Sequence, residues 1–146
     1  MLGPVTLITL LATTAVLSAQ AVKETVRLTV SGPELAAPLV VTGGPILERA
    51  HVYVGSFIRE PTRPPDASRR RYRLTFDVQA IEGVKYEAYV VHYAKGGRED
   101  EGDIYLPGPD AAEYRRNIST IRRTGHDGSW HRAEREWARA LNAILP

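Results

Sequence analysis

The strict alternation of apolar and polar residues over residues 72–80 places the strongest constraint on the fold of this chain. The apolar positions of the segment are Tyr72, Leu74, Phe76 and Val78, and polar residues separate them. Successive side chains of a β-strand point to opposite faces of a sheet, so this spacing predicts a strand with one buried face. Residues 24–32 alternate in the same way. The two segments together predict a sheet that buries one face and leaves the other polar.

Shorter segments rich in β-forming residues fill much of the remaining chain and are separated by turns. We expect strands over residues 39–42, 51–58, 85–95, 103–108, 113–123 and 129–133. Residues 96–102 form a polar hairpin tip, and Asp127-Gly128 is a hairpin signal within residues 124–128. Pro45 favours a short helix over residues 46–50, because proline is tolerated in the first turn of a helix.

The last segment, residues 134–144, has the spacing of an amphipathic helix. Trp137, Leu141 and Ile144 recur at i, i+4 and i+7, which places them on one stripe. Helix-length segments are missing between the strands, which argues against a parallel, doubly wound sheet. We therefore expect a mainly β fold (β-rich α+β), an antiparallel sandwich or open barrel with the C-terminal helix packed on the sheet.

The first 21 residues read as a signal peptide. An apolar run of 13 residues, 5–17, is followed by Ala19 and Ala21 in the small-x-small pattern of a cleavage site. The run is shorter than the roughly 20 residues of a membrane span. Cleavage after Ala21 would leave one domain, residues 22–146, periplasmic or secreted, with no stable membrane span. No Lys or Arg precedes the run, so an N-terminal membrane anchor is the alternative.

Charge and motif content exclude several classes of function. The chain has 19 basic and 17 acidic residues, a net charge of +2, which is too even a balance for a nucleic-acid binder. It has no cysteine, and neither a G-x-S-x-G nucleophile motif nor a phosphate-binding P-loop. We therefore expect no nucleic acid as a partner, no disulfide framework and no cofactor.

A loop rich in arginine and proline is the strongest functional signal. Residues 59–71 contain three prolines and hardly any apolar side chain, which predicts a long exposed loop. The planar guanidinium fork of arginine suits carboxylate and phosphate groups. The expected binding residues are Arg63, Arg69, Arg70 and Arg71 with the aromatic Tyr105. They predict a non-catalytic envelope binding or interaction module, whose partner is an anionic envelope polymer or an acidic protein surface. A merely solvated basic surface is the alternative.

Tyr105 opens the segment "YLPG", residues 105–108. The residue before a proline is pushed toward extended dihedrals, and Gly108-Pro109 then forces a corner. We interpret the segment as a strand end that turns over the core. The alternative is a rigid lip beside a binding groove, with Tyr105 as an aromatic contact.

Histidines and acidic residues offer a second class of function. His126, Asp127 and His131 lie around one predicted turn and could bind a transition metal, so a metal-dependent hydrolase-like enzyme is the alternative function. His92 lies in an apolar segment and is interpreted as a hydrogen-bonded core or edge histidine. The acidic residues within 99–103 could bind calcium, although a solvated hairpin tip explains them equally well.

The order of several short motifs resembles a group of small exported bacterial proteins of unassigned function. The shared features are a "YLPG"-like corner, an "N-x-S-T-I"-like strand and a Trp-bearing C-terminal tail. They correspond here to residues 105–108, residues 117–121, and Trp130 with Trp137. The resemblance covers nearly the whole of residues 22–146, and the length of the loop at 59–71 departs from it. It implies a shared fold and carries no catalytic residues.

Overall fold

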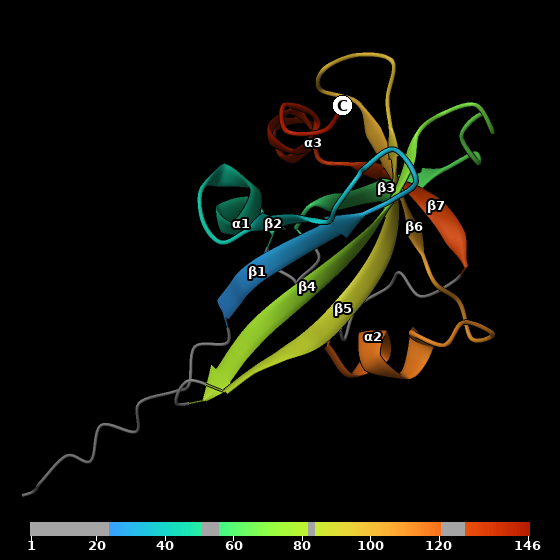
Figure 1. Cartoon of the computed structure of the whole chain (residues 1–146). Helices are drawn as coiled ribbons and strands as arrows, with labels where there is room; N and C mark the ends of the chain where they lie inside the picture. The colour runs from blue at the N-terminus through green and yellow to red at the C-terminus, as the bar shows by residue number, and fades with distance from the viewer. Residues whose placement is uncertain (1–23, 51–55, 82–83, 121–127) are drawn as a thin grey trace, which may run out of the picture.

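The computed structural model describes residues 24–50, 56–81, 84–120 and 128–146, and Figure 1 shows their arrangement. The strands are β1 (Glu24–Ser31), β2 (Leu39–Val41), β3 (Ile58–Thr62), β4 (Arg71–Ile81), β5 (Val84–Lys95), β6 (Gly102–Leu106) and β7 (Ser129–Ala133). The helices are α1 (Pro45–Arg49), α2 (Tyr114–Thr120) and α3 (Arg135–Asn142).

The seven described strands form one antiparallel sheet in the order β2-β1-β4-β5-β6-β7-β3. In the part of the chain that the structure describes, β2 and β3 are the two edges and do not pair, so the sheet is not closed. The expected mainly β fold with antiparallel strands and a C-terminal helix is therefore confirmed.

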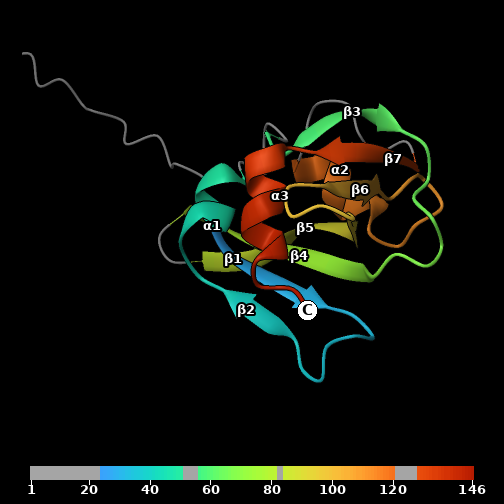
Figure 2. The same cartoon turned by 90° about the horizontal axis from the view of Figure 1, so that it is seen from above.

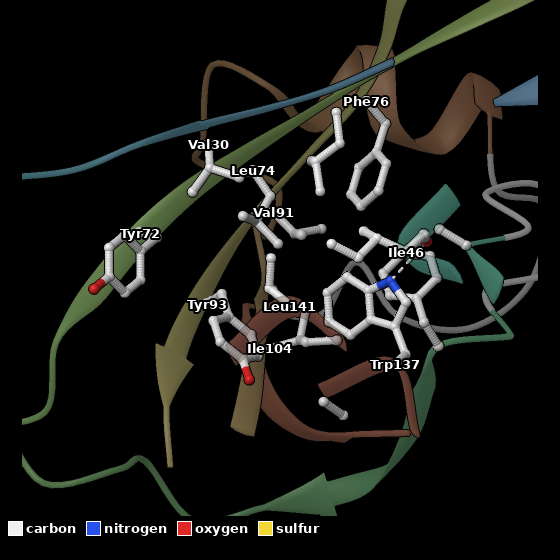
Figure 3. Packing of buried hydrophobic residues seen from close by; sticks show 14 of the residues in the cluster. Val30, Ile46, Tyr72, Leu74, Phe76, Val91, Tyr93, Ile104, Trp137 and Leu141 are labelled. Atoms are coloured by element: carbon white, nitrogen blue, oxygen red, sulfur yellow. Dashed lines mark hydrogen bonds between the residues drawn. The ribbon is translucent and has the colours of Figure 1, made fainter. Parts of the chain in front are cut away.

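One face of the sheet is apolar, and α1 and α3 pack on it (Figure 2). The alternation of residues 72–78 is confirmed, because Tyr72, Leu74 and Phe76 all point into this core. Trp137 of α3 is fully buried, and its indole Nε1–H donates to the Ile46 carbonyl at 3.1 Å, which ties α3 to α1 (Figure 3). Helix α3 ends at Asn142, so the third expected member of its apolar stripe, Ile144, lies beyond it and is exposed.

The strand predicted over residues 113–123 is wrong for its described part, which forms helix α2. Strand β6 pairs with β5 from His92 to Lys95, so the earlier part of β5 lacks β6 as a neighbour. The Asn117 side chain takes that place: its Oδ1 accepts from Val90 N at 2.9 Å, and its Nδ2 donates to Val90 O at 2.7 Å. Both backbone polar groups of Val90 in β5 are thus satisfied by a side chain of α2. The β-branched composition of residues 113–123 does not indicate this contact.

The exposed loop expected over residues 59–71 is shorter in the structure. Residues 59–62 belong to β3, where Pro61 is tolerated because β3 is an edge strand, and Arg71 begins β4. Of the strand expected over residues 51–58, residues 51–55 lie outside the described residues, and Ile58 begins β3.

The remaining loop, residues 63–70, connects two strands that are far apart in the sheet. It leaves edge strand β3 and enters β4, so it passes β7, β6 and β5 on its way (Figure 2). Its arginines are therefore carried to the ends of strands that lie far from them in the sequence.

A candidate anion-binding groove on the outer face

The register of the sheet aligns five side chains in one row across the face opposite the core. The row contains Ser31 of β1, Arg73 of β4, His92 of β5, Tyr105 of β6 and Trp130 of β7. Residues directly opposite each other on neighbouring strands project to the same face. Because Tyr72 and Leu74 point into the core, the row that includes Arg73 lies on the other, outer face.

This row lines a hollow of about 490 Å³, which we call the groove. Its remaining walls are Gly32 and Pro33, which follow β1, and Arg71 and Tyr72 at the start of β4. The groove thus combines two arginines, one histidine and the aromatic rings of Tyr105 and Trp130. Basic and aromatic groups together suit a ligand that has both an anionic group and a flat face.

The aromatic residues of the groove contact one another. The Tyr105 ring centroid lies 5.4 Å from that of Trp130 and 6.0 Å from that of His92. Trp130 is only 8% exposed, whereas Tyr105 is half-buried. Tyr105 therefore offers the more accessible aromatic surface, and the largely buried Trp130 ring packs against it.

Two contacts position the Arg71 side chain, one with the Trp130 ring and one with the loop before β4. Its guanidinium carbon lies 4.8 Å from the centroid of the Trp130 ring, and Nη2 donates to the Pro65 carbonyl at 3.3 Å. Within the described residues no carboxylate forms an ion pair with Arg71. A guanidinium group stacked on an aromatic face keeps N–H donors along its edge. Arg71 is thus a positioned fork that can donate to an anion.

The Glu113 carboxylate acts on the other two nitrogen-bearing side chains of the groove, Arg73 and His92. Arg73 Nη2 lies 3.3 Å from Glu113 Oε1, and both side chains are partly exposed. Burial lowers the pKa of His92 below its ordinary value of 6.5, with Glu113 opposing this shift and Arg73 reinforcing it. At neutral pH the His92 ring is therefore mostly uncharged, and Arg71 and Arg73 supply the positive charge of the groove.

Two of the five predicted binding residues, Arg71 and Tyr105, are brought together in the groove. Arg69 is directed elsewhere, and its Nη1 donates to Asp103 Oδ2 at 2.6 Å. Arg70 lines a second hollow beside Lys95, and Arg63 is exposed on the loop without lining the groove. Tyr105 thus combines both interpretations of the "YLPG" segment, since the strand end forms a wall of the groove.

Of the three predicted metal ligands, only His131 belongs to the described residues. His126 and Asp127 lie outside them. His131 lies in β7 and is 6% exposed, with Nδ1 at 3.2 Å from the Arg59 carbonyl and Nε2 at 3.3 Å from Ser129 Oγ. No group of three or more potential metal ligands is found among the described residues.

Two of the acidic residues considered for calcium, Asp100 and Asp103, are engaged by arginine, whereas Glu99 is exposed. Arg135 Nε donates to Asp100 Oδ2 at 3.0 Å, and Asp103 is bound by Arg69. Asp100 and Asp103 are both 4% exposed, although a solvated hairpin tip was an interpretation of this segment. Their carboxylates therefore anchor guanidinium groups.

The groove residues that were not predicted as binding residues include Arg73, His92 and Trp130. His92 was interpreted as a core or edge histidine, and the structure places it half-buried in the groove. The alternation of residues 72–80 already assigns Arg73 to the polar face. The information that was missing is the register, which brings β7 opposite β6.

Comparison with known proteins gives no relative: no family model, no curated protein and no solved structure matches this chain. Among the described residues, no helix has the length and apolar character that crossing a bilayer requires.

Proposed function

We propose that this protein is an exported, non-catalytic binding module whose groove holds a carboxylate or phosphate group of an anionic envelope polymer. The observation that carries the proposal is the Arg71 guanidinium, stacked on Trp130 and without a carboxylate within ion-pair distance among the described residues. Asp66 interacts with Arg71 only at longer range. Binding to a guanidinium group that is already positioned costs less conformational entropy than binding that must first order a free arginine side chain.

The neighbours of Arg71 support a ring-bearing ligand. Tyr105 offers a partly exposed aromatic surface in the same groove, on which the flat face of a sugar ring can pack. Arg73 adds a second guanidinium, which Glu113 balances in part. An acidic sugar unit satisfies both kinds of contact at once, so we place an acidic polysaccharide ahead of a bare inorganic anion.

Export is supported by the sequence. The predicted signal peptide and the resemblance to small exported bacterial proteins both favour a protein that meets polymers of the cell envelope. Expression of the full-length chain in bacteria should yield an envelope-fraction protein whose mass corresponds to a chain beginning at Val22. Recovery of the intact chain in the membrane fraction would favour the N-terminal anchor instead.

The groove can be tested with galacturonate, a carboxylated sugar, and with inorganic phosphate. The two tryptophan indole N–H signals in a two-dimensional NMR spectrum report on different places, because Trp130 lines the groove and Trp137 is buried in the core. We expect galacturonate to shift the Trp130 signal and to leave the Trp137 signal in place. Phosphate should shift the Trp130 signal less, because it has no ring to pack on Tyr105.

Substitution of Arg71 decides whether the fork is responsible. Arg71→Gln should weaken galacturonate binding at least about tenfold, because a hydrogen bond to a charged group is lost. Arg71→Lys should recover part of the loss, since it restores the charge without the planar fork. Arg115→Gln on α2, which is exposed and does not line the groove, is the matched control. Equal affinities of Arg71→Gln and Arg115→Gln would refute the proposal.

A further inference from the structure

Basic residues are concentrated in three hollows that lie around the ends of β4 to β7. The groove contains Arg71 and Arg73. A second hollow of about 370 Å³ is lined by Arg69, Arg70 and Lys95, together with Ser68, Gly96 and Gly97. A third of about 370 Å³ is lined by Arg98, Arg132 and Arg135, together with Asp100, Glu101, Gly102 and Ala133. Basic groups thus outnumber acidic ones in the lining of these hollows.

The three hollows have no described lining residue in common, and side-chain contacts between their residues connect them. Arg69 of the second hollow and Arg71 of the groove both reach the outer face, where Arg69 binds Asp103 and Arg71 contacts Trp130. The second and third hollows meet at Asp103, which Arg69 binds at 2.6 Å and Arg132 approaches at 3.9 Å. Asp103 is buried, and its Oδ1, on the Arg132 side, has no hydrogen-bond partner. The Asp103 carboxylate therefore attracts two arginines at the junction and accepts a hydrogen bond only from Arg69.

The pairing of β4 to β7 also connects the groove with the third hollow. Arg71, Ala94, Asp103 and Arg132 lie opposite one another on β4, β5, β6 and β7. Three strand spacings separate Arg71 from Arg132, a distance of about 14 Å between their backbones. Ala94 is a small, fully buried residue, so no long side chain rises from β5 in this row. Ala94 and Asp103 are both buried, and Arg69, which binds Asp103, therefore links the groove side of this row to Arg132 of the third hollow.

The third hollow contains more guanidinium donors than its acceptors can use. Asp100 Oδ2 accepts from Arg135 Nε at 3.0 Å, and Arg139 and Arg98 lie 3.6 and 3.8 Å from the same carboxylate. Each guanidinium carries five N–H donors. The hydrogen bond from Arg135 keeps the pKa of Asp100 below its ordinary value, so Asp100 stays ionised and holds this cluster at neutral pH. Most of the donors remain available at the surface.

We propose that the three hollows form one continuous basic track that binds several anionic groups of a single polymer chain. The basic track comprises Arg69, Arg70, Arg71, Arg73, Arg98, Arg132 and Arg135. Lys95 also lines the second hollow, but its ammonium donates to the Leu145 and Pro146 carbonyls. The inference rests on the proposed function of the groove and adds the class of ligand, a polyanion that is longer than one acidic sugar. Carboxylate and phosphate polymers share the chemistry that the basic track recognises.

Length dependence of binding tests the basic track. The protein recovered from cells that express the full-length chain is titrated with galacturonate monomer, trimer and hexamer, and with linear polyphosphate of matched charge. Simultaneous contacts by one chain raise the apparent affinity, so the hexamer should bind on the order of 10²-fold more tightly than the monomer. Stronger binding of the hexamer than of polyphosphate would identify the source as an acidic polysaccharide, and the reverse a phosphate polymer.

A double variant separates the basic track from the groove. Arg98→Gln/Arg132→Gln removes two charges whose nearest acidic partners lie 3.8 and 3.9 Å away, so the fold should be retained and can be checked by thermal unfolding. It should reduce the hexamer-to-monomer affinity ratio by about tenfold, because two exposed ionic contacts are lost. Arg49→Gln/Arg115→Gln carries the same charge change on α1 and α2 and should preserve the ratio.

The two proposals fail in different ways. A hexamer that binds no more tightly than the monomer, or a ratio that falls equally in both double variants, would overturn the basic track. In either case a tenfold loss of monomer binding in Arg71→Gln would still support the groove. Loss of discrimination between Arg71→Gln and Arg115→Gln would refute the groove itself.

Discussion

The two faces of the sheet are built from alternate residues of the same strands, and they have opposite characters. In β4, Tyr72 and Leu74 point into the core, whereas Arg71 and Arg73 line the groove. In β5, Tyr93 is fully buried on the core face and His92 is half-buried on the outer face. Helices α1 and α3 cover the first face (Figure 2), and the groove lies on the second. One set of strands thus provides both the stability of the molecule and its candidate binding surface.

The two tryptophans show the same contrast between the core face and the outer face. Trp137 contacts Phe57 at a centroid distance of 4.9 Å and Tyr93 at 5.8 Å, and its N–H is satisfied inside the core. Trp130 contacts Tyr105 and carries the Arg71 guanidinium on its ring. We therefore expect the first ring to determine folding and the second to determine binding.

The largest effect should come from removing the core ring. Trp137→Ala should lower the free energy of unfolding by about 3–5 kcal/mol, because it leaves a large cavity in a close-packed core. Trp130→Ala should lower it by about 1–2 kcal/mol, since the space that it vacates opens onto the groove and can fill with water. Urea unfolding followed by circular dichroism measures both values.

In galacturonate affinity, the same two variants should rank in the opposite order. Trp130→Ala should weaken galacturonate binding, because Arg71 loses the ring that positions it. If Trp130→Ala destabilises the fold as strongly as Trp137→Ala, the outer face contributes to the core, and the division between the two faces is wrong.

The second prediction concerns the part of β5 that helix α2 covers. Asn117→Ala should cost about 1–3 kcal/mol for each of the two backbone groups of Val90 that it leaves without a partner. Ile118→Ala on the same helix is the control, because Ile118 is exposed. Hydrogen exchange of the Val90 amide should accelerate in the first variant and stay slow in the second. Slow exchange in both would show that another group satisfies β5.

The third prediction uses a close approach on the core face. A Cβ atom added to Gly102 would lie 2.0 Å from Tyr93 Oη, and Tyr93 is fixed by its 2.8 Å hydrogen bond to Asn142. Gly102→Ala should therefore destabilise the protein by about 1–3 kcal/mol through overpacking. Gly97→Ala in the adjacent hairpin has open space for its Cβ and should be close to neutral in thermal unfolding. An equally small effect of Gly102→Ala would mean that the Tyr93 ring moves aside freely.

Local patterns in the sequence were sufficient to predict the core face. The alternation of residues 72–78 and the helical spacing of Trp137 and Leu141 each depend on neighbours in the chain, and both are confirmed. The short helix after Pro45 is confirmed for the same reason. Helix α2 was missed because its stability depends on Asn117 reaching β5, a contact between distant segments.

The groove depends on register, which no local pattern contains. Tyr105 and Trp130 are opposite each other because β6 pairs with β7, and the alternation within either strand does not specify that pairing. The arginine-rich segment was read as one binding unit. In the structure Arg69 turns to Asp103, and Arg71 turns to Trp130. A cluster in the sequence thus becomes a series of separate positions along the sheet.

The smallest predicted effect is a pH dependence that should differ between stability and binding. The folded-state pKa of His92 lies below its ordinary value of 6.5 because the ring is partly buried, with Arg73 adding to the shift and Glu113 opposing it. As the pH falls below 6.5, the unfolded chain takes up this proton first, so the free energy of unfolding should decrease through this window. His92→Gln should remove this part of the loss. The carboxylates of Asp100 and Glu134 have lowered pKa values and remain ionised there, so their contribution is lost at lower pH.

Binding should respond to the same proton in the opposite direction. Protonated His92 adds a positive charge beside Tyr105 and Arg73, so an anion in the groove should raise the pKa of His92 and should itself bind more tightly as the pH falls. Galacturonate should therefore raise the melting temperature more at mildly acidic than at neutral pH, and this difference should disappear in His92→Gln. Equal shifts at both pH values in the unmodified protein would mean that the anion binds away from His92, outside the groove that distinguishes the outer face from the core.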